Sequence, residues 1–222
     1  MEKETVVFHS VDRKILESYK SVIEGMAEYM GTAYEFVLHS LEDYDHSVIA
    51  IINGQHTGRS VGAPITNLAL EMLGKIEHSE HSDHISYFTK NKDGAPLKST
   101  TIAIRGYGNR IIGLICINLY LNTEFDVVIR NFLPANTQED QLVEHESFEV
   151  DSQTLLVQSF QEAQTAVESN PEIPYVNRNK EIIRILYNKR IFDLKDAVSY
   201  VAQKLAISKN TVYMHIRNCR NT

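Results

Sequence analysis

Basic and hydrogen-bonding side chains gather at positions 208–217, close to the end of this 222-residue chain. Within the stretch SKNTVYMHIR, Lys209 and Asn210 can reach base edges in a DNA major groove, where asparagine suits adenine. Four neighbours can hold the phosphate backbone or flank the bases: Ser208, Thr211, Tyr213 and Arg217. We therefore predict that these six residues bind double-stranded DNA.

The charge balance also sets this end of the chain apart. Residues 177–222 hold ten Lys and Arg against three Asp and Glu, whereas residues 1–176 hold twelve against twenty-six. The net charge of −7 thus combines an acidic body with a basic end. A basic module of this kind is expected of a domain that binds a polyanion, although a solvated basic helix would have the same charge.

The elements that carry these side chains are predicted to be two short helices. Apolar residues recur at helical spacing from Leu194 to Leu205. Ser208 is a strong N-cap for a second helix, in which Val212 and Ile216 lie one turn apart and point inward. Two such helices joined by a tight turn form a helix-turn-helix.

The turn itself departs from the usual pattern. Its central position is usually glycine, and here it is Ala206, which can adopt the turn conformation at modest cost. A further helix within residues 179–194 precedes the motif and completes a three-helix unit. An ordinary helical hairpin that touches no DNA is the alternative structure for this segment.

The first 133 residues show a different pattern, in which one helix, two strands, a loop, a second helix and three strands follow one another. The helices are expected at 11–31 and 66–78, and the loop at 53–66. The strands are expected at 34–41, 47–54, 84–91, 97–106 and 110–122. Turn residues at Asp93-Gly94 and at Gly106 and Gly108 indicate hairpins between the last three strands. This order is typical of a PAS-like sensor domain with a five-stranded antiparallel sheet.

We accordingly predict an α+β fold, in which this PAS-like sheet with helices is followed by a C-terminal all-α helix-turn-helix. The expected domains are a sensor at 1–133, a linker and connecting helix at 134–176, and a DNA-binding domain at 177–222. The connecting helix has apolar residues at near-heptad spacing within 152–170, which suits packing on a partner or on the body.

Polar residues near the predicted loops and strand ends could line a small ligand pocket. Arg59 is the side chain of the glycine-rich loop 53–66 that can grip a carboxylate with two hydrogen bonds. The other candidates are Asn53, Thr57, Thr66, Ser99 and Thr100. Alternatively, these side chains only satisfy the backbone of turns.

Other chemistry finds little support in the sequence. His78, His81 and His84 are three residues apart among acidic residues, a spacing that Zn²⁺ or Ni²⁺ could use on a helix, but a solvated polar connector is favoured. The chain lacks GxSxG and HExxH motifs and paired cysteines. We expect no metal, no cofactor and no enzymatic activity.

The beginning of the chain, MEKETVVFHSVDRK, lacks the apolar core of a signal peptide, and no run approaches the roughly 20 apolar residues that span a bilayer. We therefore expect a cytoplasmic protein with no membrane association.

Three stretches carry a resemblance that covers nearly the whole chain: NGQHTGRSVGAPITNLAL (53–70), KDGAPLKSTTIAIRGYGNRIIGLICIN (92–118) and IFDLKDAVSYVAQKLAISKNTVYMHIRN (191–218). In these the chain resembles the YheO-like transcriptional regulators. The resemblance implies a PAS-like sensor domain, a helix-turn-helix that binds operator DNA, and a dimeric bacterial regulator. It transfers no effector, because members need not share one.

Two functions remain open at this point. The favoured one is a regulator, a repressor in particular, that senses a small-molecule effector and binds operator DNA as a homodimer. The alternative is a non-catalytic adaptor whose C-terminal helices bind a protein partner. The polar outer face expected for 208–217 favours nucleic acid, since a protein-docking face should expose large apolar residues.

Overall fold

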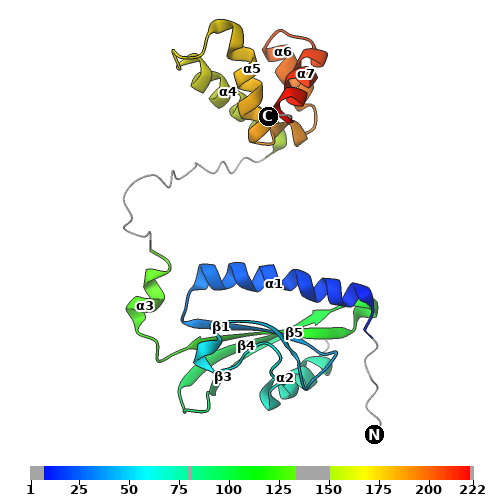
Figure 1. Cartoon of the computed structure of the whole chain (residues 1–222), viewed down its shortest axis with the longest axis vertical. Coiled ribbons are helices and arrows are strands. Elements are labelled where there is room, and N and C mark those ends of the chain that lie inside the picture. Colours follow the sequence, from blue (N-terminus) through cyan, green and yellow to red (C-terminus); the bar gives the residue numbers. More distant parts are fainter. Residues whose placement is uncertain (1–7, 80–81, 134–150, 221–222) are drawn as a thin grey trace. The chain divides into compact units, whose positions relative to one another are not determined.

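The structure is a computed structural model and describes residues 8–79, 82–133 and 151–220. The chain divides into two compact units, residues 1–138 and 139–222, called here the N-terminal unit and the C-terminal unit (Figure 1). Each unit is described by itself. None of the helices within the described ranges is long and apolar enough to cross a membrane.

The N-terminal unit is built on a five-stranded antiparallel sheet with the strand order β2-β1-β5-β4-β3. Its strands are β1 (Tyr34–Ser40), β2 (Val48–Ile52), β3 (His84–Lys90), β4 (Pro96–Arg105) and β5 (Ile111–Tyr120). Its helices are α1 (Ser10–Met30), α2 (Asn67–Glu77) and α3 (Phe125–Arg130), with short 3₁₀ turns η1 (Gly54–His56) and η2 (Tyr107–Asn109). The predicted PAS-like sheet is confirmed, and α3 is a short helix that was not predicted from the sequence.

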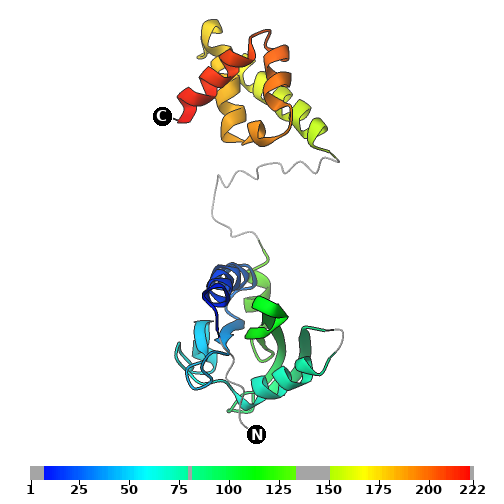
Figure 2. The same cartoon turned by 90° about the vertical axis from the view of Figure 1, so that its right-hand side faces the viewer.

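Helices cover both faces of the sheet, with α1 on one side and α2 on the other (Figures 1 and 2). Successive residues of a strand point to opposite faces. Phe36 and Leu38 of β1 accordingly pack in one core with Ile23 of α1. Val37, between them, packs in a second core with Leu73 of α2. Because both faces are covered, β1 is buried along nearly its whole length.

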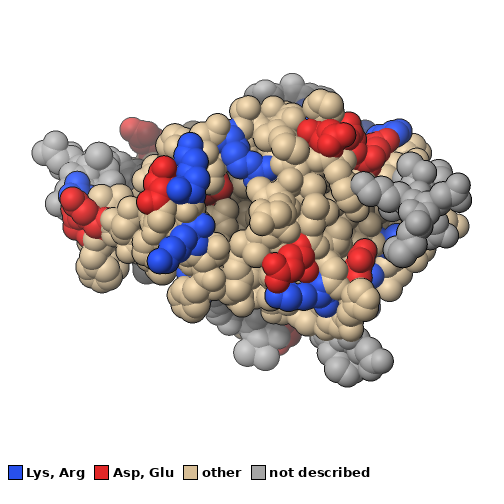
Figure 3. Space-filling view, turned by 90° about the horizontal axis from the view of Figure 1, so that it is seen from below, with Lys and Arg blue, Asp and Glu red and all other residues tan. Residues whose placement is uncertain are grey.

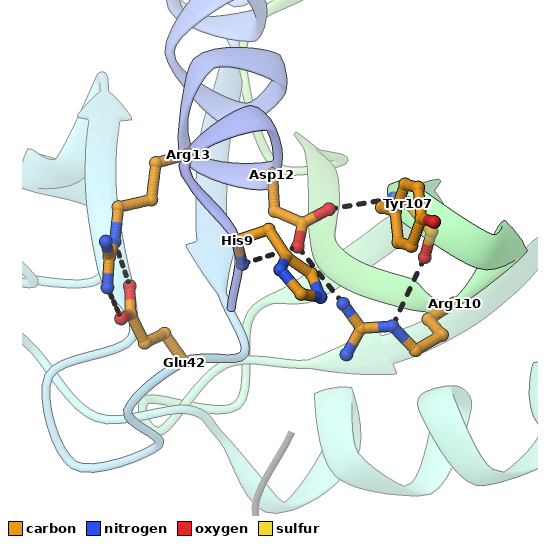
Figure 4. A network of polar contacts seen from close by, with 6 residues as sticks. All are labelled: His9, Asp12, Arg13, Glu42, Tyr107 and Arg110. Carbon is orange, nitrogen blue, oxygen red and sulfur yellow. Dashed lines mark hydrogen bonds and ion pairs between the residues drawn. The ribbon is translucent and has the colours of Figure 1, made fainter. Parts of the chain in front are cut away.

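A buried carboxylate ties the start of α1 to the hairpin between β4 and β5 (Figure 4). Asp12 Oδ2 accepts the His9 N–H at 2.9 Å and lies 3.1 Å from Arg110 Nη2. Asp12 Oδ1 accepts the Tyr107 N–H at 2.8 Å. The His9 N–H, followed by the Tyr107 N–H, lowers the pKa of this fully buried carboxyl. Position 106 must be glycine, because a Cβ there would lie 2.2 Å from Asp12 Oδ1.

Replacing Asp12 with asparagine is expected to lower the Tm of the N-terminal unit by at least about 5 °C at pH 7, because an amide cannot accept from all three donors. Since the folded-state pKa is depressed, the stabilisation by the Asp12 carboxylate is present at neutral pH and is lost as pH falls through that pKa. Calorimetry of the full chain, with the exposed Asp45→Asn as control, measures the difference. Equal melting of D12N and wild type would contradict the expectation.

Charges on one face of the molecule are largely mixed in sign. Figure 3 shows one face, on which most Lys and Arg side chains lie next to Asp or Glu. Pairs such as Arg105 with Asp83 and Lys75 with Glu71 are each 2.7 Å apart. Exposed pairs of this kind contribute little to stability individually. On that face, therefore, the acidic residues do not form one continuous patch.

The described part of the C-terminal unit is entirely helical. It contains α4 (Ser152–Glu168), α5 (Arg178–Asn188), α6 (Ala197–Lys204) and α7 (Lys209–Arg220), with short turns η3 (Tyr175–Asn177) and η4 (Ile191–Asp193). Buried residues of all four helices and of η4 form one core: Leu156, Phe160, Ala163, Val167, Ile182, Ile183, Leu186, Ile191, Ala197, Val201, Ala202, Val212 and Ile216. The predicted α+β fold with a C-terminal all-α helix-turn-helix is confirmed.

Helix α4 belongs to this core. Phe160 and Ala163 are almost completely buried and cluster with Ile183 of α5. The Phe160 ring also meets the Tyr200 ring edge-on, with centroids 5.8 Å apart. The sequence placed this helix in a connecting segment, 134–176, because an apolar stripe shows that a helix packs but not on what. Residues 134–150, predicted as a linker, lie outside the described residues.

The first helix of the motif is shorter than its apolar pattern. It begins at Ala197, because Leu194 is extended (φ −75°, ψ 146°) and Asp196 is left-handed (φ 63°). Leu194 nevertheless packs against the core. Helical spacing thus identified the buried side chains correctly but did not separate the helix from the turn that leads into it.

Candidate nucleic-acid interface and ligand cavity

The turn between α6 and α7 has a defined hydrogen-bonding pattern. Ile207 N donates to Ala202 O at 3.0 Å. Ala206 N donates to Gln203 O at 3.2 Å, which completes a Schellman motif. Ala206 takes the left-handed position of that motif, with φ 54°. The tight turn predicted here is therefore formed without glycine.

Replacing Ala206 with glycine is expected to stabilise the C-terminal unit by up to about 1 kcal/mol. Glycine removes the strain of a left-handed L-residue. It also raises the conformational entropy of the unfolded chain, which offsets part of the gain in stability. Urea denaturation followed by far-UV circular dichroism measures the change. The control Ala166→Gly, at an exposed position inside α4, should instead destabilise by about 1 kcal/mol. If A206G destabilised the unit as much as A166G, the assigned strain would be incorrect.

Helix α7 presents one apolar and one polar face. Val212 and Ile216 are buried in the core. Four side chains predicted to contact DNA are exposed: Lys209, Asn210, Tyr213 and Arg217. The inward and outward faces of this helix are thus as the spacing predicted.

The two remaining candidates, Ser208 and Thr211, act at the start of the helix. Ser208 Oγ accepts the Thr211 N–H at 3.1 Å and lies 2.8 Å from Thr211 Oγ1. These hydroxyls therefore fix the helix N-terminus, the end at which backbone N–H groups and the helix dipole attract phosphate.

A groove of about 960 Å³ lies beside α7. Its lining includes Asn210, Tyr213 and Arg217, together with Arg190 and Arg220. Arg190 and Arg220 were not predicted from the sequence. The positive charge of residues 177–222 was the available signal, but it could not show that Arg190, beyond the end of α5, comes close to α7.

The N-terminal unit contains a cavity of about 520 Å³. Residues of β1, β3, β4 and β5 line it, together with residues from the segment 57–69 and the loop after β3. Four predicted ligand-binding residues lie there: Thr57, Arg59, Thr66 and Ser99. Of these, Thr66 also caps α2, since its Oγ1 accepts the Ala69 N–H at 3.1 Å.

Asn53 and Thr100, also predicted to bind a ligand, do not line the cavity. Asn53 Nδ2 donates to Tyr34 O at 2.6 Å, so this side chain satisfies the backbone, the alternative left open from the sequence. Thr100 pairs with Ser86 of β3 through hydroxyls 2.9 Å apart. Because Thr100 follows Ser99 on the strand, its side chain points to the opposite face of the sheet.

A row of hydrogen bonds crosses the cavity floor. Ser99 Oγ donates to Asn118 Oδ1 at 2.8 Å, and Asn118 Nδ2 donates to Glu35 Oε1 at 3.0 Å. Thr57 Oγ1 donates to Glu35 Oε2 at 2.6 Å. Strand register creates this row, since Glu35 and Ser99 both lie directly opposite Asn118. Glu35 and Asn118 were not predicted from the sequence, in which the only signal was an acidic residue inside the apolar strand YEFVLHS.

Two further cavity residues are neutral near pH 7. Burial, followed by the charge of Arg59, lowers the pKa of His39 to about 4. His39 Nδ1 lies 2.8 Å from Ser47 Oγ. Burial raises the pKa of the Cys116 thiol to about 11. The fixed charges at this cavity therefore come from its carboxylate, guanidinium and lysine groups.

The histidine-rich connector shows no metal geometry in its described part. His78 Nδ1 lies 2.6 Å from Gly74 O, and His84 lies near Ser82. His81 lies outside the described residues. Within 8–79, 82–133 and 151–220, no group of three or more His, Cys, Asp or Glu side chains could hold a metal ion.

Comparison with known proteins identifies both units. A family model of the YheO-like PAS domain matches residues 10–134, and a model of an HTH domain matches residues 156–217. The protein named YheO from Escherichia coli strain K12 is 40% identical over 214 residues, which cover 96% of this chain and 88% of that protein. This chain belongs to the YheO family.

Other relatives of this YheO-family chain include a Haemophilus influenzae protein that is 39% identical, over 96% of this chain and 95% of that protein. Among solved structures, the PAS domain of a Colwellia psychrerythraea protein matches 46% of this chain and 99% of that domain, at 17% identity and a TM-score of 0.34. The domain content of this YheO-family chain indicates a DNA-binding regulator with a sensory domain rather than an enzyme.

Proposed function

We propose that this chain is a transcriptional repressor that binds operator DNA as a homodimer, under the control of a small-molecule effector in its PAS-like unit. The exposed polar face of α7 carries the proposal. Lys209 and Asn210 stand in its first turn, while Val212 and Ile216 hold the opposite face in the core. The helix can thus enter a major groove without disturbing the packing behind it.

The geometry of operator reading supports a homodimer. Each chain carries one α7, and a single recognition helix reads only a few base pairs. Two copies related by a two-fold axis would read half-sites about one DNA turn apart. Contacts from Arg217, Arg190 and Arg220 to phosphates would release counterions, so affinity should fall steeply as salt rises.

Selection of bound duplexes from a random pool, at two salt concentrations, tests this function. A palindromic motif whose recovery falls with salt is the expected result. Absence of enrichment with a folded protein would favour the adaptor function, for which exposed Tyr213 and Met214 would be the contact groups.

Alanine at Asn210 is expected to weaken operator binding by roughly 1–3 kcal/mol and to relax the base preference at one position in each half-site. Alanine at Lys209 should weaken binding by a similar amount, by loss of a base or phosphate contact. Fluorescence anisotropy with the selected operator measures both. Lys180→Ala, which removes the same charge from an exposed site on α5, is the matched control. Unchanged affinity for N210A and K209A would remove these residues from the interface.

A further inference from the structure

Two opposite charges without ionic partners line the cavity of the N-terminal unit. We propose that they bind the two ends of a small zwitterion, with its ammonium group at Glu35 and its carboxylate at Arg59. The proposal rests on the regulator function above and assigns the chemical class of its effector.

Glu35 supplies the cation-binding end. The residue is 1% exposed, and its carboxylate accepts two hydrogen bonds from neutral donors, Thr57 and Asn118. A carboxylate has about four acceptor sites, so about half of its capacity is unused. It forms no ion pair within the described residues, although a buried charge is costly unless a counter-charge pairs with it. An ammonium group from the cavity would supply both the charge and the missing donors.

Arg59 supplies the anion-binding end. Its Nη2 donates to Pro64 O, and among the described residues it too has no acidic partner. A guanidinium has five N–H donors, so most remain available for a carboxylate, which it can bind with two parallel bonds. Lys90 and Lys92, exposed at the same cavity, add positive charge on this side.

The side chains of Glu35 and Arg59 belong to the same cavity. Both line the cavity, yet they form no ion pair with each other. Cys116 lines the same cavity, and burial, above all, raises the pKa of its thiol, while the charge of Arg59 lowers it and that of Glu35 raises it. Val37, Leu97 and Cys116 give the same cavity an apolar wall. A volume of about 520 Å³ accommodates a small molecule that bridges the two charges and rests its uncharged part on this wall.

Thermal shift of the full chain with the standard amino acids as the probe panel, at millimolar concentrations, tests the proposal. At least one member should raise the Tm. The corresponding decarboxylated amine and deaminated acid, each lacking one charge, should bind at least about tenfold more weakly. Glu35→Gln and Arg59→Gln should each weaken the zwitterion about tenfold or more while remaining folded by circular dichroism. Two controls change charges outside the cavity: Glu28→Gln and Lys98→Gln.

Absence of a shift with every member of the panel would overturn the proposal. So would equal binding of a zwitterion and its singly charged analogues, or binding unaffected in both E35Q and R59Q. Because this assay contains no DNA, its outcome is separate from operator selection. If a zwitterion binds but no operator is selected, the cavity assignment stands and the regulator function is rejected. If operators are selected but no zwitterion binds, the regulator function stands and the cavity assignment is rejected.

Discussion

Replacing Phe160 with alanine is expected to destabilise the C-terminal unit by about 3–5 kcal/mol. The side chain is 3% exposed and packs in the core that also contains Val201 of α6 and Val212 of α7. Its removal deletes the contact with Tyr200 and leaves a cavity that helices fixed at several points cannot readily fill. A loss of this size is a large share of the 5–15 kcal/mol that stabilises a typical domain.

Urea denaturation followed by far-UV circular dichroism measures this loss. Gln161→Ala, at the next position but on the exposed face of α4, is the matched control and should change stability little. If α4 were an independent connector, F160A would leave the unfolding of the other helices unchanged. That result would contradict the assignment of α4 to the helix-turn-helix core. If the chain binds operator DNA as proposed, this loss would also lower operator binding without any change in the exposed face of α7.

Acidification from pH 7 to pH 4 is expected to cost the N-terminal unit roughly 3 kcal/mol through His39 alone. In the unfolded chain this imidazole binds a proton near pH 6.5, whereas burial lowers its pKa in the fold to about 4. Between these values the unfolded state binds more protons, so stability falls as pH falls. The part of the unfolding free energy that depends on neutral His39 is therefore present above pH 6.5 and largely lost at pH 4.

His39→Gln removes the titration while keeping a group that can hydrogen-bond to Ser47. Hydrogen exchange of β1 and β5 should be measured at several pH values. As pH falls, the protection of their amides should drop steeply in wild type and less steeply in H39Q. His46 acts in the opposite sense, since Asp43 raises its pKa, but it lies on the surface and contributes little. Parallel pH profiles for wild type and H39Q would show that another group causes the acid sensitivity.

Most of the element order could be predicted from the sequence, because the signals are local. Periods of two and of 3.6 residues identified the strands and helices, and the turn residues separated them. The helix-turn-helix was equally readable, since Ser208, Val212 and Ile216 lie within a few residues of one another. The basic C-terminal segment could also be identified, because net charge is obtained by counting charged residues and does not depend on the fold.

The cavity could be predicted only in part. The sequence indicated Thr57, Arg59, Thr66 and Ser99, but no local pattern connected them with Glu35 on β1 or Asn118 on β5. Thr100 was selected with Ser99, although adjacent strand residues cannot both face one cavity.

What the sequence alone determined was therefore the kind of protein: a PAS-like sheet followed by a helix-turn-helix, with a basic last helix. Only the tertiary structure decided which side chains share a site. The β1–β5 and β4–β5 registers place Glu35 and Ser99 opposite Asn118, and helix packing brings α4 into the C-terminal core. The physical reason is that register and packing join residues far apart in the chain, so a periodicity measured along the chain cannot reveal them.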